Sequence, residues 1–268
     1  MPGTDSVIVK KVLPLIYVID TSGSMDGDRI SSVNRAMREL EPILREKVAE
    51  IPEAEIKIGA ITFSNGAKWL TPQGLVSVEH FYWNDAKAGG LTDLGAALKE
   101  LNAKLSRSSF LVSETGFCAP VLIFMSDGEP NDNWEKELKN ISQSNRWFQI
   151  ARKIAIAIGD EANKKVLEEI VRDKEAVIQT SDLETLKNMI IAVSVSASMM
   201  AGSSRMAGDE ASGASILRNA TANLDDDKIV FESADEQPVF DAPDPIPVTL
   251  NDTGAGDTGW EELDEEWS

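Results

Sequence analysis

Sulfur and imidazole ligands are nearly absent from this chain of 268 residues, which has one cysteine, Cys118, and one histidine, His80. A single cysteine excludes an intramolecular disulfide framework and every site built from several thiolates, such as a zinc or iron–sulfur centre. A single histidine excludes the metal motifs that need two imidazoles and argues against most Ser-His-Asp triads. A metal site in this chain is therefore expected to use oxygen ligands.

Long apolar runs are also absent, and basic residues are fewer than acidic residues. No run approaches the roughly 18 to 20 apolar residues that a membrane span requires. The 26 Lys and Arg against 45 Asp and Glu give a formal net charge of -19, which repels phosphate backbones and anionic lipid. We therefore expect no direct binding to nucleic acid or membrane. The short apolar run at 12–19 ends in Asp20 and not at a small-residue cleavage site, which predicts a cytoplasmic protein.

The negative charge is concentrated near the C-terminus. Residues 197–268 have 17 acidic and 3 basic side chains, whereas residues 1–196 have 28 and 23. The C-terminal part also lacks a sustained hydrophobic period and buries too little apolar surface to offset its ordering entropy. We expect a folded domain over about 6–196 and a disordered acidic tail over 197–268, whose removal should leave the melting temperature nearly unchanged.

Within the predicted domain, short apolar runs alternate with amphipathic segments. The runs are typical of strands buried on both faces, at residues 13–19, 56–63, 121–125 and 154–158, with a shorter strand at 176–179. Apolar residues at steps of three and four predict helices over 30–48, 93–106, 134–149, 161–172 and 182–195. An edge strand with a turn is expected at 69–78. The pattern predicts a doubly wound, mostly parallel open α/β sheet with ligands at the carboxyl ends of its strands.

Hydroxyl and carboxylate side chains follow these strands. Asp20, Ser22 and Ser24 come directly after the first strand, Asp127 follows the strand at 121–125, and Thr92 precedes the helix over 93–106. Oxygen ligands with at most two charges suit a hard divalent cation, and we expect Mg²⁺, with another divalent cation as the alternative. A helix N-cap is the alternative for Asp20, Ser22 and Ser24 taken alone. The matching positions of Thr92 and Asp127 favour the metal site.

These five positions resemble the metal-ion-dependent adhesion site (MIDAS) of the von Willebrand factor type A (VWA) family, whose pattern is D-x-S-x-S, then a distant Thr and a distant Asp. The resemblance covers about 10–195 and implies a VWA fold, which is Rossmann-like. It implies that Ser22, Ser24 and Thr92 coordinate the metal directly or through water, while Asp20 and Asp127 orient waters and hydroxyls.

A finer resemblance concerns the stretch that begins Gly89-Gly90-x-Thr92. With the short loops, this stretch is most similar to stand-alone bacterial VWA proteins of the tellurite-resistance type. Those proteins are associated with a protein kinase and a PP2C-like phosphatase. The resemblance thus implies a bacterial stress or phospho-signalling system with these two enzymes as partners.

Two functions fit these residues. The first is a noncatalytic protein-binding module, in which a partner's Asp or Glu carboxylate fills an open position of the metal, because one divalent cation between two acids can accept one more anion. The second is a Mg²⁺-dependent phosphohydrolase, because doubly wound sheets with Asp at strand ends also host phosphatases. A haloacid-dehalogenase-type enzyme needs a second Asp two residues after its nucleophile, where this chain has Ser22. That difference favours the binding module.

The last ten residues, 259–268, combine three large apolar side chains with five carboxylates. Trp260, Leu263 and Trp267 are spaced by three and four residues, which would place them on one face of a helix. We therefore predict a segment that folds on docking to a partner, or onto the metal site of another copy of the protein. The alternative is a solubilising acidic tail.

Overall fold

The computed structural model describes residues 10–48, 51, 54–202 and 212–222. The predicted docking segment at 259–268 lies outside these residues, as does most of the predicted acidic tail. None of the helices in the described ranges is both long enough and apolar enough to cross a membrane.

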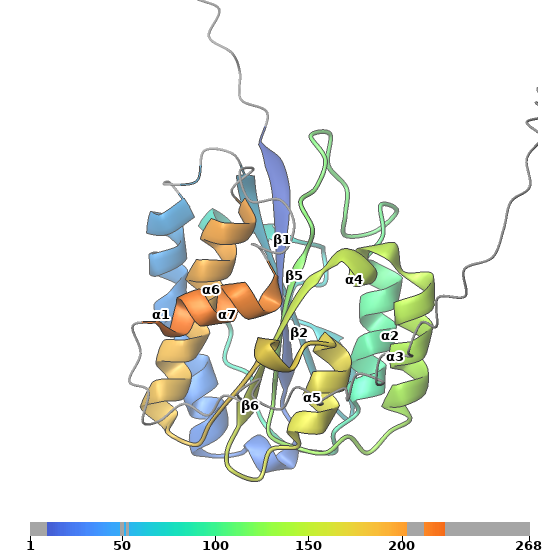
Figure 1. Ribbon diagram of the computed structural model, residues 1–268, viewed down its shortest axis with the longest axis vertical. Helices are drawn as coiled ribbons and strands as arrows, with labels where there is room; N and C mark the ends of the chain where they lie inside the picture. Colours follow the sequence, from blue (N-terminus) through green and yellow to red (C-terminus); the bar gives the residue numbers. More distant parts are fainter. Residues whose placement is uncertain (1–9, 49–50, 52–53, 203–211, 223–268) are drawn as a thin grey trace, which may run out of the picture. The chain divides into compact units, whose positions relative to one another are not determined.

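A mostly parallel sheet forms the centre of the fold, as predicted (Figure 1). Its parallel strands are β1 (Lys11–Asp20), β2 (Ala54–Ser64), β5 (Val121–Ser126), β6 (Arg152–Ile158) and β7 (Val177–Thr180). In space they follow the order β2-β1-β5-β6-β7. Leu15 of β1 pairs with Ile58 on one side and with Val121 on the other, so β1 lies inside the sheet. This position explains its nearly uninterrupted apolar sequence.

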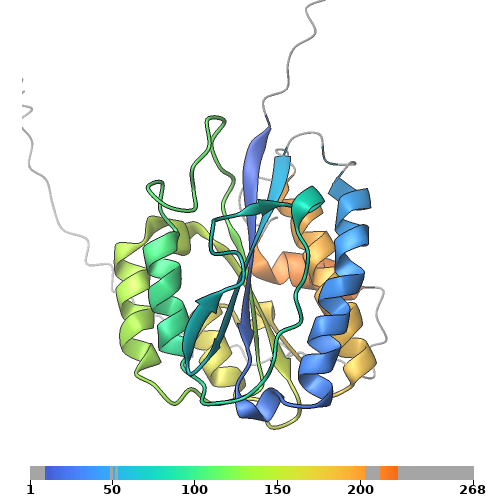
Figure 2. The ribbon, with the colours of Figure 1, turned by 180° about the vertical axis from the view of Figure 1, so that it is seen from behind.

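The edge of the sheet beyond β2 is antiparallel (Figure 2). The single edge strand predicted at 69–78 is two short strands, β3 (Gly66–Trp69) and β4 (Val76–Ser77), which both pair with β2. The turn predicted between them is present, because Gly74 N donates to Thr71 O at 3.1 Å. A 3₁₀ helix, η2 (Val78–His80), follows β4.

Helices cover both faces of the sheet (Figures 1 and 2). One core contains Leu15 and Tyr17 of β1 and packs against α1 (Asp28–Val48) and α6 (Leu183–Gly202). The other contains Ile16 and Val18 and packs against α2 (Leu94–Lys104), α3 (Trp134–Ser144) and α5 (Lys164–Val171). Alternate side chains of one strand thus serve two cores, as expected for strands that are buried on both faces.

The helix predicted over 134–149 is interrupted at Asn145. The Asn145 side chain accepts a hydrogen bond from Phe148 N at 3.0 Å and donates to Leu105 O at 3.1 Å. It therefore begins a new helix, α4 (Arg146–Ile150), while holding the end of α2. Apolar spacing continues across the break, which is why the sequence pattern shows one helix where the structure has two.

Ordered elements extend beyond residue 196, where the domain was predicted to end. Helix α6 continues to Gly202, and another helix, α7 (Gly213–Thr221), packs against α6, against β6, and against the 3₁₀ helix η3 (Lys174–Ala176). Ile216 and Leu217 of α7 are fully buried. The prediction of a tail over 197–268 thus missed a helix that completes one core, because the helix is short and its sequence is rich in small residues.

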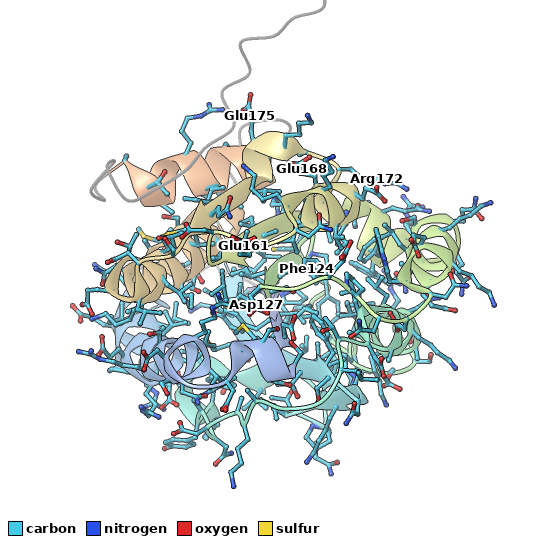
Figure 3. All side chains as sticks on the ribbon, turned by 90° about the horizontal axis from the view of Figure 1, so that it is seen from below. Phe124, Asp127, Glu161, Glu168, Arg172 and Glu175 are labelled. Carbon is cyan, nitrogen blue, oxygen red and sulfur yellow. The ribbon has the colours of Figure 1, made fainter. Side chains whose placement is uncertain are left out.

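The chain order of the strands places a crevice at one end of the sheet. The chain leaves β1 to pair β2 on one side, and it later returns to pair β5 on the other side of β1. In open α/β sheets such a reversal opens a ligand site beyond the carboxyl ends of the strands. Figure 3 views the molecule from this end, with Asp127 near the middle of the view.

Candidate metal centre

The first carboxylate of the site is Asp20, the last residue of β1. It is fully buried, and its Oδ1 accepts a hydrogen bond from Ser22 N at 2.8 Å. The loop that follows is fixed to β2 by Thr21, whose backbone N and side-chain Oγ1 both donate to Phe63 O. Residues Gly23–Met25 then form the 3₁₀ helix η1, for which Ser22 makes no side-chain capping bond. This geometry argues against the N-cap alternative for Ser22.

The second carboxylate is Asp127, directly after β5. Its Oδ1 accepts from Ser24 Oγ at 2.8 Å, and Ser24 Oγ lies 3.0 Å from Ser22 Oγ. A second bond joins the same two strand ends, because Ser126 Oγ of β5 donates to Asp20 Oδ2 of β1 at 2.6 Å. These bonds connect the ends of β1 and β5 through the polar groups predicted from the sequence, with Ser126 added to them.

Thr92 reaches the same place from the loop that precedes α2. Two backbone bonds hold this loop against the segment that follows β1, from Gly23 N to Gly90 O at 3.0 Å and from Gly89 N to Thr21 O at 2.9 Å. Gly90 has a φ of +90°, and a Cβ there would lie only 2.6 Å from Asn65 Nδ2. A side chain at Gly90 would thus be strained and would disturb the loop that carries Thr92.

All five predicted side chains gather beside Gly128. An ideal Cβ placed on that glycine would lie 3.5 Å from Ser24 Oγ, 3.8 Å from Thr92 Oγ1 and 4.0 Å from Asp20 Oδ2. Ser22 and Asp127 join this cluster through their contacts with Ser24. Oxygen atoms of Asp20, Ser24 and Thr92 therefore face one space beside Gly128, and Asp127 borders it through its bond with Ser24.

The electrostatics of the site favour a bound cation. Burial raises the pKa of Asp20, and the nearby Asp127 adds to this effect, while hydrogen bonds from Ser126 and Ser22 act in the opposite direction. Asp20 makes no ion pair within the described ranges. The Asp127 side chain is fully buried and pairs with the Arg29 guanidinium. A divalent cation between the two carboxylates would compensate both of them.

The donor set fits a hard divalent cation. The described residues contain no group of three or more His, Cys, Asp and Glu side chains placed to hold a metal ion. Here two carboxylates are combined with the hydroxyls of Ser22, Ser24 and Thr92. Neutral hydroxyls and few charged ligands suit Mg²⁺, which keeps several of its waters. The residues present thus fit a bound Mg²⁺ ion.

Comparison with known proteins identifies the family. The family model described as the von Willebrand factor type A domain matches residues 15–191. The chain belongs to the VWA family. The match begins inside β1 and ends inside α6, so it contains all five residues of the VWA site predicted above.

Solved structures support the VWA fold. A von Willebrand factor type A protein from Catenulispora acidiphila is 16% identical, with a TM-score of 0.50 over 69% of this chain and 42% of that one. Proximal thread matrix protein 1 from the mussel byssus is 22% identical, with a TM-score of 0.50 over 68% and 48%. The pilus adhesin SpaC from Lactobacillus rhamnosus GG is 13% identical, with a TM-score of 0.52 over 69% and 30%. The chain thus matches less than half of each structure, and no curated protein matches it.

Three contacts of the candidate metal centre were not predicted from the sequence. Ser126 supports Asp20, Arg29 pairs with Asp127, and Asn131 holds Thr92. Ser126 offered a signal, because it is the hydroxyl residue next to Asp127 at the strand end. Arg29 and Asn131 offered none, because their roles depend on which loops meet in space.

The reciprocal bonds of Asn131 lead to a prediction. Asn131 Oδ1 accepts from Thr92 N at 2.9 Å, and Asn131 N donates to Thr92 O at 3.0 Å. Asn131→Ala removes the bond from Thr92 N and keeps the backbone bond to Thr92 O, so it should loosen Thr92 and weaken Mg²⁺ binding about tenfold, although all five predicted side chains remain. Isothermal titration calorimetry measures this change. Asn133→Ala is the control, because Asn133 caps α3 without a side-chain hydrogen bond. Equal affinities in both variants would contradict the role of Asn131.

Proposed function

We propose that this chain is a noncatalytic, metal-dependent protein-binding module. VWA domains commonly act as metal-dependent protein-interaction modules and are generally not enzymes. The observation that carries the proposal is the convergence of five oxygen-bearing side chains beside Gly128, at the carboxyl ends of β1 and β5.

Mg²⁺ is the proposed cation, and this chain's residues have distinct tasks toward it. Ser22, Ser24 and Thr92 would hold the ion directly or through water, and Asp20 and Asp127 would orient these hydroxyls and waters. The bound ion supplies a positive charge with room for one more ligand. The hydrogen bonds from Ser22 N and Ser126 Oγ already fix both oxygens of Asp20, so this carboxylate is oriented in advance.

The proposed ligand is an Asp or Glu side chain of a protein partner. Two positive charges on the ion balance Asp20 and Asp127, so a further anion meets no excess of negative charge at the ion itself. The surface beside Thr92 is not wholly polar, because the Leu91 side chain is exposed. A carboxylate that reaches the ion would thus lie next to an apolar contact, which suits a folded protein surface better than a small acid.

A Mg²⁺-dependent phosphohydrolase is the alternative from another class. Such an enzyme needs a nucleophile or a general base beside the reacting phosphorus. Ser22 occupies the position where a haloacid-dehalogenase-type enzyme has its second Asp. Its hydroxyl bonds to Ser24 in this structure. We expect no metal-dependent turnover of an aryl phosphate, and turnover that disappears in the Ser22→Ala variant would favour the enzyme.

We also propose the biological setting of the module. The similarity of the stretch that begins Gly89-Gly90-x-Thr92 to bacterial tellurite-resistance-type proteins supports a cytoplasmic stress or phospho-signalling system. A protein kinase and a PP2C-like phosphatase are the partners proposed on that basis. This part of the proposal rests on the sequence resemblance alone.

Capture of partners tests the function. The full chain should retain its partners from a lysate of the source cells in millimolar Mg²⁺ and lose them in chelator, as quantified by mass spectrometry. Thr92→Ala should lose them in both conditions. Thr115→Ala is the matched control, because Thr115 lies in the exposed loop before β5, at the opposite end of that strand. Capture that survives both chelator and Thr92→Ala would place the binding surface elsewhere.

A further inference from the structure

Arg29 is a charged residue at the site that belongs to neither the predicted ligands nor their supports. It lies in the first turn of α1, five residues after Ser24. Its guanidinium pairs with Asp127 Oδ2, and the same Nη1 atom donates to Ser24 O at 3.3 Å. One side chain thus contacts two of the residues that the proposed metal ion would need.

The ion pair gives Asp127 a counter-charge of its own. The Asp127 side chain has no exposed surface, whereas the Arg29 side chain is 34% exposed. A buried carboxylate without a counter-charge is strongly unfavourable, so removal of the Arg29 charge would destabilise the fold when no metal is bound. A divalent ion beside Asp127 would supply the same compensation and would repel the guanidinium at short range. The two cations therefore compete for one carboxylate.

The surroundings of Arg29 offer it a second position. Arg29 lines a cavity of about 160 Å³ together with Gly159, Asp160 and Glu161. The guanidinium lies over Gly159, where a Cβ would come within 2.8 Å of Nη2. Asp160 and Glu161 follow the carboxyl end of β6, as Asp127 follows that of β5. An arginine displaced from Asp127 would thus find space in a cavity whose lining includes Asp160 and Glu161.

We propose that Arg29 is a built-in competitor of the metal, a cation that occupies Asp127 in the metal-free protein and leaves it when the ion binds. This inference rests on the proposed metal site and adds the residue that sets its affinity. Arg29 stabilises the empty site and weakens metal binding by the same interaction. Loading of the site is then coupled to the movement of one side chain toward Asp160 and Glu161.

Calorimetric titration of Mg²⁺ and Mn²⁺ into two full-length variants tests the competition. Arg29→Gln keeps a hydrogen-bonding group and removes the charge, so it should bind metal about tenfold more tightly than the unaltered protein. Arg35→Gln is the matched control, because Arg35 lies on the same helix and makes exposed ion pairs with Glu39 and Glu184. It removes the same charge from the chain and should change the affinity less than twofold.

Melting temperatures give a second test, in which the expected difference between Arg29→Gln and the unaltered protein depends on whether metal is present. In chelator, Arg29→Gln should melt below the unaltered protein because Asp127 loses its counter-charge. In saturating Mg²⁺ the difference should disappear, so the shift induced by metal is larger in the variant. Weaker or unchanged metal binding in Arg29→Gln would overturn the competitor role and leave Arg29 as a positioning residue for Asp127. Failure of every variant to bind either ion would instead refute the proposed metal site, and the competitor role with it.

Discussion

Truncation after residue 196 is expected to lower the melting temperature by about 10 °C or more, whereas truncation after residue 222 should leave it nearly unchanged. The first truncation removes the end of α6 and all of α7. Ile216 and Leu217 are fully buried, and loss of such side chains from a core costs about 2 to 5 kcal/mol each. That sum is a large fraction of the stability of an ordinary domain.

Local contacts explain why α7 belongs to the domain. Ser212 begins the helix by accepting a hydrogen bond from Ser215 N at 3.1 Å. Gly213 follows at a point where a Cβ would lie only 2.2 Å from Lys153 O, so α7 meets the backbone of β6 directly. Its buried face then contacts α6 and β7. A chain that ends at 196 would leave this part of the core exposed to water.

Thermal unfolding followed by circular dichroism measures the effect on both truncated chains. The chain that ends at residue 222 is the control, since it loses the acidic segment and keeps α7. Identical melting of the chains ending at 196 and at 222 would mean that α7 adds nothing to the core. The stable unit would then end near residue 196, as predicted from the sequence, although α7 packs against the domain.

The charge count shows why the sequence placed the domain boundary too early. The segment 197–222 has two acidic and two basic residues, whereas 223–268 has fifteen acidic and one basic. A charge count over the whole range 197–268 therefore made residues 197–222 look acidic, although the acidic residues lie mainly in 223–268. The boundary in the composition therefore lies near 222, at the end of the last described helix, and not at 196.

The fold and the site differ in what the sequence alone can predict. The parallel strands were predicted because burial on both faces leaves uninterrupted apolar runs, and the five oxygen-bearing side chains because each follows a strand or precedes a helix. The bonds from Asn131 to Thr92 and from Arg29 to Asp127 join residues 39 and 98 positions apart. Nothing local in the chain distinguishes such polar residues from other polar surface residues.

The largest expected effect at the site is stabilisation by Mg²⁺. A ligand that binds only the folded state adds about 2.7 kcal/mol at 100 times its dissociation constant. Without metal, the fold also contains a buried negative charge that lowers its stability, and the ion would compensate this charge. Because burial raises the pKa of Asp20, the ionised carboxylate destabilises the fold at neutral pH, and this cost disappears as the pH falls below the ordinary pKa of an aspartate. The melting temperature should therefore rise with Mg²⁺ at neutral pH and fall in chelator.

The double change Ser22→Ala with Ser24→Ala should erase this metal-induced shift without unfolding the chain. It removes two of the three proposed ligand hydroxyls, and the β1–β5 pairing beneath them does not depend on either side chain. Half-buried Ser106 and exposed Ser108 give a matched control, because their hydroxyls are also two residues apart and lie 3.1 Å from each other. Their double alanine variant should keep the full shift. A shift that persists in Ser22→Ala with Ser24→Ala would mean that Mg²⁺ stabilises this protein from another place, since the remaining oxygens of Asp20, Thr92 and Asp127 offer too few ligands to preserve the affinity.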